Sequence, residues 1–312
     1  MSAQLRPRTA LVHLVRAANG EAPFDAFMTS YERLDAGHEH ELVLLLKGFG
    51  APDLLQAIRR RAAAHAPSEI RVGDEGLDIE AYLKAAGCLP HEQVCLLNSF
   101  SEPLVDGWLG ALAEPLADHR TGATAATGSW GSILGFGLWQ AGLGGSYDCV
   151  FGDRRQTRDV WHAANGLGRP NDRSYRVRNA IDVLRTLGVG SLFPAVHLRT
   201  NAFCIRRQTL QGLAISAART RRANYGLESG RDSITRRLQA RDLGTLVVGR
   251  SGVPLEPSRW PEAAVFWQDE QQDLLVGDNQ TRLYDAATPA QRAALRGYAW
   301  GLHARPSARS DG

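Results

Sequence analysis

The stretch ELVLLLKGFGAPDLLQAIRR, residues 41–60, decides the fold class. Its first part, Glu41–Lys47, is a nearly continuous apolar run, which is typical of a strand buried on both faces of a sheet. A short turn follows, and Pro52 begins a helix that carries Leu55 and Ile58 on one face. A buried strand followed at once by an amphipathic helix predicts a βα unit of a parallel sheet.

The same order of elements repeats on both sides of this stretch. Further strands are predicted at Ala10–Val15, Glu69–Val72, Gln93–Leu97 and Thr121–Thr127. Helices are predicted to begin at Phe24 and at Asp78, which would be the N-cap, and to cover Pro103–Ala117. After residue 130 the pattern changes, and we expect helical or irregular structure over 153–185, a strand at Leu198–Ile205, a helix at Ser229–Ala240, a strand at Thr245–Gly249 and a helix at Pro289–Leu302. The prediction is an α/β fold with a mostly parallel central sheet, helices on both faces and a smaller C-terminal helical part.

Composition places the chain among folded globular proteins, because 44% of its 312 residues are hydrophobic and 22% are charged. Its 36 basic side chains nearly balance its 33 acidic ones. The charge is nevertheless polarised, since residues 1–120 carry 11 basic and 17 acidic groups whereas residues 121–312 carry 25 and 16. Only Lys47 and Lys84 are lysines, so the cations are almost all guanidinium groups, which suit bidentate phosphate contacts. A codon bias would give the same enrichment.

The sequence lacks several easily recognised sites. It contains no Walker A loop, no Gly-x-Gly-x-x-Gly, no His-Glu-x-x-His and no Gly-x-Ser-x-Gly. Its four cysteines do not have the spacing of a structural zinc site, and we interpret them as reduced thiols. His13 and Arg16 interrupt the apolar stretch near the N-terminus, so no signal peptide is predicted. We therefore expect a cytoplasmic protein.

One uncharged segment, Thr121–Tyr147, is long enough to span a bilayer. Its eight glycines make a poor transmembrane helix, so a buried strand followed by a mobile Gly-rich loop is the favoured interpretation. The alternative is that Trp130 and the apolar residues after it contact a lipid or a lipid-linked substrate.

Polar side chains gather where the predicted parallel strands end. In open parallel sheets, ligands bind beyond the carboxyl ends of the strands. Each such residue taken alone is explained as a turn or cap residue. Together they predict a site for a ribose and a base, and they are Arg16, Asn19, Lys47, Asp74, Asp78, Asn98, Ser99, Ser101 and Glu102.

A second concentration is cationic, because Val183–Leu227 contains no acidic residue. Arg199, Thr200 and Asn201 open an apolar strand and supply guanidinium, hydroxyl and amide donors together. Such donors suit a diphosphate leaving group. The other arginines of this run are explained as a solvated surface, and they are Arg185, Arg206, Arg207, Arg219, Arg221 and Arg222.

Two carboxylates follow this run directly. Glu228 and Asp232 are four residues apart, which places them on one face if a helix starts there. A helix N-terminus favours the ionised carboxylate, and an ionised carboxylate near cations is suited to act as a general base toward a hydroxyl. The simpler alternative is that both acids only support Ser229 in capping the helix.

The joint pattern resembles a known family. LVHLVRAANG, ELVLLLKGF, GLDIEAYLKAAG, VCLLNSFSEPLVDGWLGALAEPL, GATAATGSW, FPAVHLRTNAF and YGLESGRDSITRRL occur in this order, and together they resemble bacterial family 2-like glycosyltransferases with the GT-A nucleotide-diphospho-sugar transferase fold. The resemblance covers roughly residues 9–250, with DNQTRLYDAA and YAWG similar to the C-terminal part of the group.

The resemblance implies roles for the residues singled out above. It places Arg16, Asn19, Lys47 and Asp78 with Asn98, Ser99 and Ser101 around the nucleotide sugar, Arg199, Thr200, Asn201 and Trp130 by the diphosphate or acceptor, and Glu228 or Asp232 as the base. Family members usually hold Mg²⁺ or Mn²⁺ with an Asp-x-Asp motif, where this sequence reads Asn98-Ser99-Phe100-Ser101-Glu102. Either Glu102 or Asp106 substitutes, or arginines such as Arg199 neutralise the diphosphate, or catalysis is lost.

The resulting hypothesis is an inverting hexosyltransferase-type glycosyltransferase that moves a sugar from a nucleoside diphosphate to a hydroxyl of a polysaccharide or lipid-linked glycan. It divides the chain into a nucleotide-sugar half at 1–130, an acceptor and catalytic half at 131–255, and a C-terminal helical extension at 256–312. The expected location is the cytoplasm, and the alternative is the inner face of the membrane with peripheral contact. The alternatives are a non-catalytic sugar-nucleotide-binding or partner protein and a nucleic-acid binder, and nucleic acid is not expected because no binding motif is present.

Overall fold

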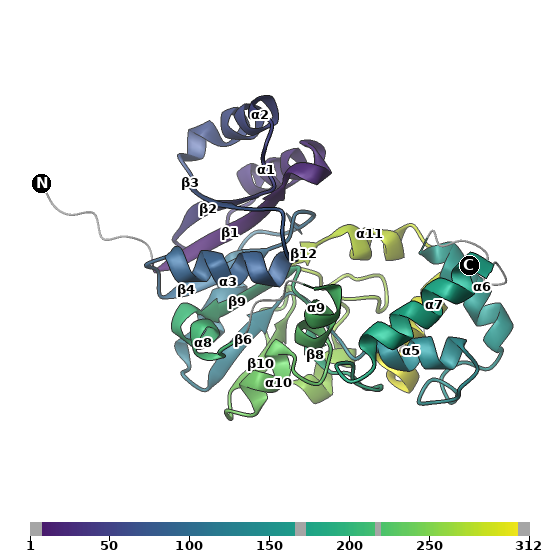
Figure 1. Cartoon of the computed structure of the whole chain (residues 1–312). Coiled ribbons are helices and arrows are strands. Elements are labelled where there is room, and N and C mark those ends of the chain that lie inside the picture. The colour runs from purple at the N-terminus through teal and green to yellow at the C-terminus, as the bar shows by residue number, and fades with distance from the viewer. Residues whose placement is uncertain (1–7, 166–172, 216–219, 305–312) are drawn as a thin grey trace, which may run out of the picture.

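An eight-stranded sheet forms the centre of the computed structural model, which describes residues 8–165, 173–215 and 220–304 (Figure 1). The strand order is β11-β10-β6-β9-β4-β1-β2-β3. The strands are β1 Thr9–Arg16, β2 His40–Lys47, β3 Ser68–Val72, β4 Gln93–Leu97, β6 Thr121–Ala125, β9 Ala202–Arg206, β10 Gly244–Val248 and β11 Pro254–Leu255. Two short ribbons complete the strands: β5 Glu102–Pro103 pairs with β12 Val276–Gly277, and β7 Gly128–Ser129 pairs with β8 His197–Leu198.

The sheet is mostly parallel. Strands β3, β2, β1 and β4 run in one direction, β9 runs opposite to both of its neighbours β4 and β6, and β10 is parallel to β6. Strand β11 ends the sheet as an antiparallel edge. The α/β fold class predicted from the sequence, with its mostly parallel central sheet, is therefore confirmed.

Helices cover both faces of the sheet. They are α1 Ala22–Arg33, α2 Pro52–Ala62, α3 Asp78–Cys88, α4 Trp108–Ala113, α5 Ile133–Gln140, α6 Arg154–Ala164, α7 Arg173–Thr186, α8 Arg207–Gly212, α9 Arg221–Glu228, α10 Ile234–Gln239, α11 Asn279–Asp285 and α12 Pro289–Trp300. Short 3₁₀ turns lie at Ala17–Asn19 (η1), Ala63–His65 (η2), Glu114–Ala117 (η3), Pro257–Glu262 (η4) and Gly301–His303 (η5).

The apolar run in β2 explains why the helices form two layers. Leu42, Leu44 and Leu46 belong to one core together with residues of α1, α2 and α4. Val43 and Leu45 point the other way and join a core that includes α3, α8, α10 and α12. Successive side chains of a strand alternate between faces, so a strand covered on both sides must be apolar throughout.

Helices α5, α6, α7 and α12 form a group beside the sheet (Figure 1). Helix α7 packs on α5, and α6 packs on α12. An aromatic cluster of Phe136, Trp139, Tyr147 and Phe151 lies inside this group. No helix within the described residues is long and apolar enough to cross a membrane.

Several predicted elements differ from the structure. Residues 133–140 of the Gly-rich segment after Trp130 form helix α5 where a loop was predicted, and Ser132 caps this helix by accepting a hydrogen bond from the backbone N–H of Gly135. Glycine also lets α7 approach closely, since a Cβ at Gly137 would lie 2.8 Å from Val183. The helix predicted over Pro103–Ala117 is shorter, with α4 and η3 covering residues 108–117, and the strand expected from Leu198 begins at Ala202.

Candidate functional site

A cavity of about 430 Å³ lies where β4 ends, between the β7/β8 ribbon, the end of α9 and the segment 266–280. This volume is within the range of small-molecule sites. The predicted residues that line it are Asp78, Asn98, Arg199, Thr200, Asn201 and Glu228. The structure therefore brings together side chains from both concentrations of polar residues in the sequence.

Two carboxylates line the cavity, one from each half of the sequence. Asp78 is the first residue of α3, and Glu228 is the last residue of α9. Burial raises the pKa of both carboxyl groups. The charge of Asp78 raises the pKa of Glu228 further, whereas a hydrogen bond with Asn224 and the charge of Arg199 lower it. Glu228 thus holds its proton more tightly than an exposed glutamate does.

The helix start predicted at Ser229 is wrong. Helix α10 begins at Ile234, and Ser233 is its N-cap because its side chain accepts from the backbone N–H of Arg236. Glu228 therefore ends one helix and does not start another, so the nearby helix dipole opposes its negative charge. Asp232 lies between the two helices, with 65% of its side chain exposed and an ion pair to Arg237, and it does not line the cavity.

Arg199 is held in place on three sides. Its Nη2 donates to Asp278 Oδ2 at 2.8 Å, its Nη1 donates to Thr127 Oγ1 at 3.3 Å, and its guanidinium lies 3.9 Å from the centre of the Phe266 ring. Asp278 is buried and also caps α11, where it accepts from the backbone N–H groups of residues 280 and 281. The result is a fixed cation at the cavity wall, with little conformational entropy left to lose when an anion binds.

The sequence analysis did not identify Asp278. Its position in the chain, three residues before Thr281, is the pattern of a capping box, and the structure contains that box. This pattern predicts where a helix starts, but it does not predict that the Asp278 carboxylate contacts Arg199. Phe266, Trp267 and Tyr298 also line the cavity and were not predicted.

The residues after β4 hold one another in a tight turn. Asn98 Oδ1 accepts from the backbone N–H of Phe100 at 2.9 Å and from Ser101 Oγ at 3.0 Å. Ser101 Oγ also contacts the backbone carbonyl of Asn201, so its hydroxyl is fully engaged within the protein. Ser101 therefore shapes the turn, while Asn98 faces the cavity.

Thr200 and Asn201 connect this turn to the carboxylates. Thr200 Oγ1 lies 3.4 Å from Glu228 Oε1. The side-chain oxygen of Asn201 accepts from Thr127 Oγ1 at 2.6 Å, while its Nδ2 is buried and has no hydrogen-bond partner. Asn201 is thus oriented by one end of its amide and leaves a donor at the cavity.

Four more predicted residues carry buried polar atoms that lack hydrogen-bond partners. They are Arg16 Nε, Asn19 Nδ2, Asp78 Oδ1 and Ser99 Oγ. Arg16, Asn19 and Ser99 lie together beyond β1 and β4, and Arg16 approaches Asp78 at 4.0 Å. A buried polar atom without a partner costs about 1–3 kcal/mol, and such atoms are rare in folded proteins. These atoms lie close together at one edge of the sheet.

Two other predicted site residues, Lys47 and Trp130, are buried inside the protein and lie away from the cavity. Lys47 is buried, and its Nζ donates to the carbonyl of Asp74 at 2.8 Å and contacts the Asp74 carboxylate at 3.2 Å. Trp130 is also buried, and it packs edge-on against Trp300 and His303. Neither side chain lines the cavity, although Ser129 and Gly131 on both sides of Trp130 do.

The two acidic residues considered as replacements for the Asp-x-Asp motif, Glu102 and Asp106, are both engaged by other parts of the protein. Glu102 forms an ion pair with Arg282, and Asp106 accepts from the backbone N–H of Asp35 at 2.9 Å. Across residues 8–165, 173–215 and 220–304, no group of three or more histidine, cysteine, aspartate or glutamate side chains is arranged to hold a metal. A divalent cation bound here would therefore depend on fewer protein carboxylates and on the phosphates of a substrate.

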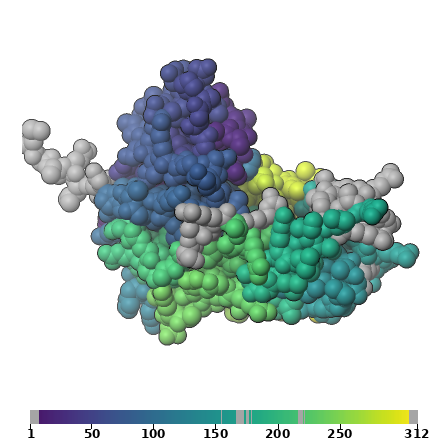
Figure 2. Space-filling view, viewed as in Figure 1, coloured from purple at the N-terminus to yellow at the C-terminus, as the bar shows by residue number. Residues whose placement is uncertain are grey.

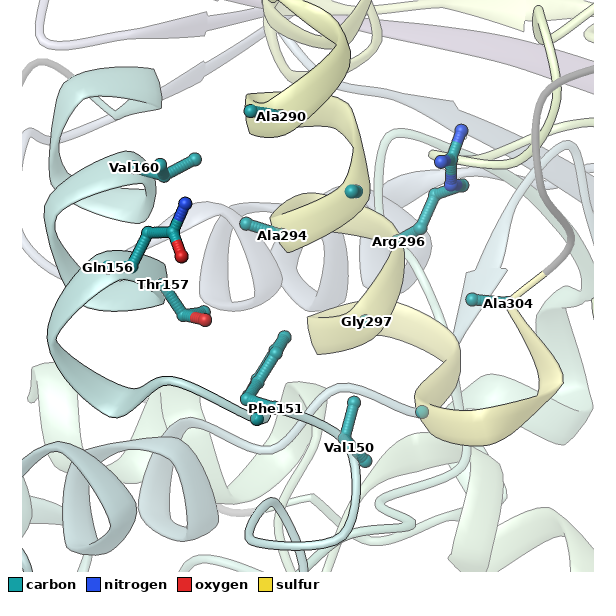
Figure 3. A pocket seen from close by; sticks show the side chains of 13 residues that line it. Val150, Phe151, Gln156, Thr157, Val160, Ala290, Ala294, Arg296, Gly297 and Ala304 are labelled. Atoms are coloured by element: carbon teal, nitrogen blue, oxygen red, sulfur yellow. The ribbon is translucent and has the colours of Figure 1, made fainter. Parts of the chain in front are cut away.

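A second cavity, of about 470 Å³, lies between α6 and α12 (Figure 3). Its wall consists mainly of small apolar side chains, such as Val160, Ala290 and Ala294, with Phe151 at one end. It contains no carboxylate, and Arg296 is its one charged lining residue among the described side chains. It therefore lacks the acid and base groups that the cavity at the strand ends provides.

No protein-family model matches the chain, and no curated protein matches its sequence. Its structural neighbours include GT-A-type nucleotide-sugar glycosyltransferases at low sequence identity. It is similar to a mannosyltransferase from Pyrobaculum calidifontis in complex with GDP-mannose and Mn²⁺, with a TM-score of 0.38 and 15% identity over 69% of this chain. The match spans half of that chain, 50%.

Two other solved structures have comparable scores. Glucosyl-3-phosphoglycerate synthase from Mycobacterium tuberculosis, with Mn²⁺, UDP and its product, has a TM-score of 0.40 and 14% identity over 77% of this chain and 69% of that one. CMP:2-keto-3-deoxy-manno-octonic acid synthetase with CTP has a TM-score of 0.39 and 10% identity over 76% and 88%. Similarity at this level leaves the function to be judged from the residues of the cavity.

Proposed function

We propose that this protein is a glycosyltransferase that moves a sugar from a nucleoside diphosphate to an acceptor hydroxyl. The observation that carries the proposal is the row of unpartnered polar atoms at Arg16, Asn19, Ser99 and Asp78, beside a cavity that also holds a fixed arginine and a buried glutamate. A nucleoside offers several donors and acceptors to such atoms, a diphosphate offers anionic oxygens to Arg199, and a hydroxyl offers a proton to Glu228.

The donor would lie along the carboxyl ends of the strands. Arg16, Asn19 and Ser99 are assigned to the nucleoside, with Asp78 between them and the cavity. Arg199 and the free amide donor of Asn201 are assigned to the diphosphate. In this arrangement the guanidinium stabilises charge that develops on the leaving group, and it needs no reorganisation because Asp278 already orients it.

Glu228 is the better candidate for the general base. It lines the cavity, whereas Asp232 is exposed and paired with Arg237. The raised pKa of Glu228 also makes it a stronger base once it is ionised. The step we propose is one displacement with inversion: the acceptor oxygen bonds to the anomeric carbon, the bond from that carbon to the diphosphate oxygen breaks with its electron pair, and Glu228 takes the hydroxyl proton.

The proposal also includes the division of the chain, the type of transferase and the acceptor. We assign residues 1–130 to the donor, residues 131–255 to the acceptor and catalysis, and residues 256–312 to a C-terminal extension whose segment 266–280 closes one wall of the cavity. A family 2-like bacterial hexosyltransferase that acts on a polysaccharide or lipid-linked glycan at the inner face of the membrane fits this division. The acceptor would reach Glu228 from the side of Tyr298 and the β7/β8 ribbon.

The test is a thermal-shift screen of UDP-, GDP-, CMP- and dTDP-sugars, followed by release of nucleoside diphosphate with and without Mn²⁺. A ligand that binds only the folded state raises its melting temperature. We expect one donor class to stabilise the wild type and to be turned over, and Glu228→Gln to keep the stabilisation but lose turnover. Absence of both binding and turnover across the panel contradicts the proposal.

A non-catalytic sugar-nucleotide-binding protein is the second candidate, and it is favoured by the sequence Asn98–Glu102, which has no Asp-x-Asp motif. The two candidates differ in what Glu228 does. If a donor stabilises the protein but neither wild type nor variant releases nucleoside diphosphate, and Glu228→Gln leaves glycan output of the host unchanged, the binding protein is the correct description.

A further inference from the structure

Helix α7 carries exposed aliphatic side chains on the face that is turned away from α5. Its inner face packs on α5: Asn179 donates to the carbonyl of Gly137, and Thr186 is buried. On the outer face, Val177, Ile181 and Leu184 are spaced four and three residues apart, so they form one stripe. Val177 is 52% exposed and Leu184 is 64% exposed. A solvated helix normally carries polar residues there.

Two further exposed aliphatic side chains follow α7 in the sequence. Leu187 and Leu192 are also exposed, at 44% and 53%. We call these five aliphatic residues the α7 surface: Val177, Ile181, Leu184, Leu187 and Leu192. In Figures 1 and 2 the teal α7 segment lies on the face of the molecule that is turned toward the viewer. Continuous exposed apolar patches mark contacts with proteins or membranes.

Arginines border the α7 surface, and hydrogen bonds fix two of them there. Arg222 Nη2 donates to the carbonyl of Leu187 at 2.9 Å, and Arg231 Nε donates to the carbonyl of Gly190 at 3.1 Å. Arg185 lies on α7 itself, where it pairs at 3.5 Å with Asp182. Residues 183–227 include no acid, although Asp182 on α7 offsets the charge of Arg185.

We propose that the α7 surface docks on a lipid bilayer that contains anionic headgroups. Exposed aliphatic side chains on a helix bordered by arginines provide the two contributions that hold an interfacial helix, which are apolar burial and attraction to anionic lipid. The contact is peripheral, since no described helix can span a membrane.

This proposal does not depend on glycosyl transfer, but it is compatible with it. Helix α7 contacts α9, and the last residue of α9 is Glu228 at the cavity. A bilayer held at the α7 surface would therefore lie one helix away from the proposed base. A substrate anchored in that bilayer would have a short path to the cavity.

The experiment measures co-sedimentation of the purified full chain with vesicles of phosphatidylcholine alone and of phosphatidylcholine mixed with phosphatidylglycerol. We compare wild type, the double variant Leu184→Glu/Leu187→Glu, and the control Val253→Glu. Val253 is 55% exposed and lies before β11, outside the α7 surface. All three substitutions are at exposed positions, so unchanged melting temperatures are expected and are checked first.

We expect the wild type and Val253→Glu to bind the anionic vesicles, to bind neutral vesicles weakly, and to lose binding at high salt. The double variant should bind anionic vesicles about tenfold more weakly, because it replaces apolar contact with negative charge. Equal binding by the double variant, or no binding by wild type, overturns the proposal. So does a wild-type dimer that the double variant converts to monomer without changing vesicle binding, since the surface would then serve self-association.

Discussion

Asp278 Oδ2 lies 2.8 Å from Arg199 Nη2, and the two residues are 79 positions apart in the chain. Both side chains are largely buried, with 1% and 15% of their surface exposed. Asp278 therefore serves two purposes: it caps α11 and it orients the cation of the cavity. The C-terminal segment is thereby tied to the catalytic half of the proposed enzyme.

Replacement of Arg199 by Ala is expected to reduce both stability and donor binding. It leaves the buried carboxylate of Asp278 without its ionic partner, and breaking such a pair costs about 3–5 kcal/mol. Asp278→Asn, which retains a side-chain oxygen for the cap, should cost less stability but still weaken donor binding, because Arg199 is no longer held. Urea unfolding and donor titration measure the two effects. The control is Arg259→Ala, which breaks an exposed pair with Glu262 and should change the free energy of unfolding by less than about 1 kcal/mol.

Replacement of Glu228 by Gln separates activity from stability. Loss of a general base is expected to lower turnover about 10²–10⁴-fold. Because burial raises the pKa of Glu228 in the folded protein, the folded state holds this proton to a higher pH than the unfolded chain does. The contribution of Glu228 to the free energy of unfolding therefore falls as pH rises through the folded pKa.

Wild type should thus lose stability relative to Glu228→Gln as the pH rises above the usual pKa of a glutamate, and its turnover should rise with pH over the same limb. Melting temperatures and pH–rate profiles of both proteins provide the data. Asp232→Asn is the matched control, since Asp232 is exposed, and it should alter neither profile. A large loss of turnover in Asp232→Asn would assign the base to Asp232 instead.

Ser99 and Ser101 allow a direct comparison between a hydroxyl that is proposed to bind the donor and a hydroxyl that stabilises the turn after β4. The hydroxyl of Ser99 is buried without a partner, whereas that of Ser101 bonds to Asn98 and contacts the carbonyl of Asn201. Ser99→Ala should leave the melting temperature unchanged or raise it, and weaken donor binding by about 0.5–1.5 kcal/mol. Ser101→Ala should lower stability by about 1 kcal/mol. If Ser99→Ala binds the donor like wild type, Ser99 does not face the nucleoside.

The features of the fold and of the site that could be predicted are those that depend on local sequence patterns. The buried run at β2 and the polar residues after β1 and β4 required only periodicity and the rule that ligands bind at strand ends. Asp278, Phe266 and Trp267 were missed because their segment has no periodic pattern and meets Arg199 only through long-range folding. The helix start was misplaced because Ser229 and Ser233 are both plausible caps, and only the structure shows that Ser233 is used.

Gly131 is a glycine whose missing side chain shapes the cavity. A Cβ at this position would lie 2.5 Å from Cε1 of Tyr298, and both residues line the cavity. Phe136 and Trp161 pack against Tyr298, so the open direction for its ring is toward the cavity. Gly131→Ala should therefore cost about 1–3 kcal/mol of stability by overpacking and shift the Tyr298 ring into the cavity.

The same variant should raise the KM for the acceptor more than the KM for the donor, because Tyr298 lies on the proposed acceptor side. The matched control is Gly87→Ala, at an exposed position in α3 where a Cβ would meet nothing within 4 Å. Ala is the better helix former there, so this control should gain about 0.5–1 kcal/mol and leave both KM values unchanged. Urea unfolding measures the change in stability, and steady-state kinetics measure the KM values for donor and acceptor. If Gly131→Ala is as stable as wild type and raises the donor KM instead, Tyr298 lies on the donor side and the proposed direction of acceptor approach is reversed.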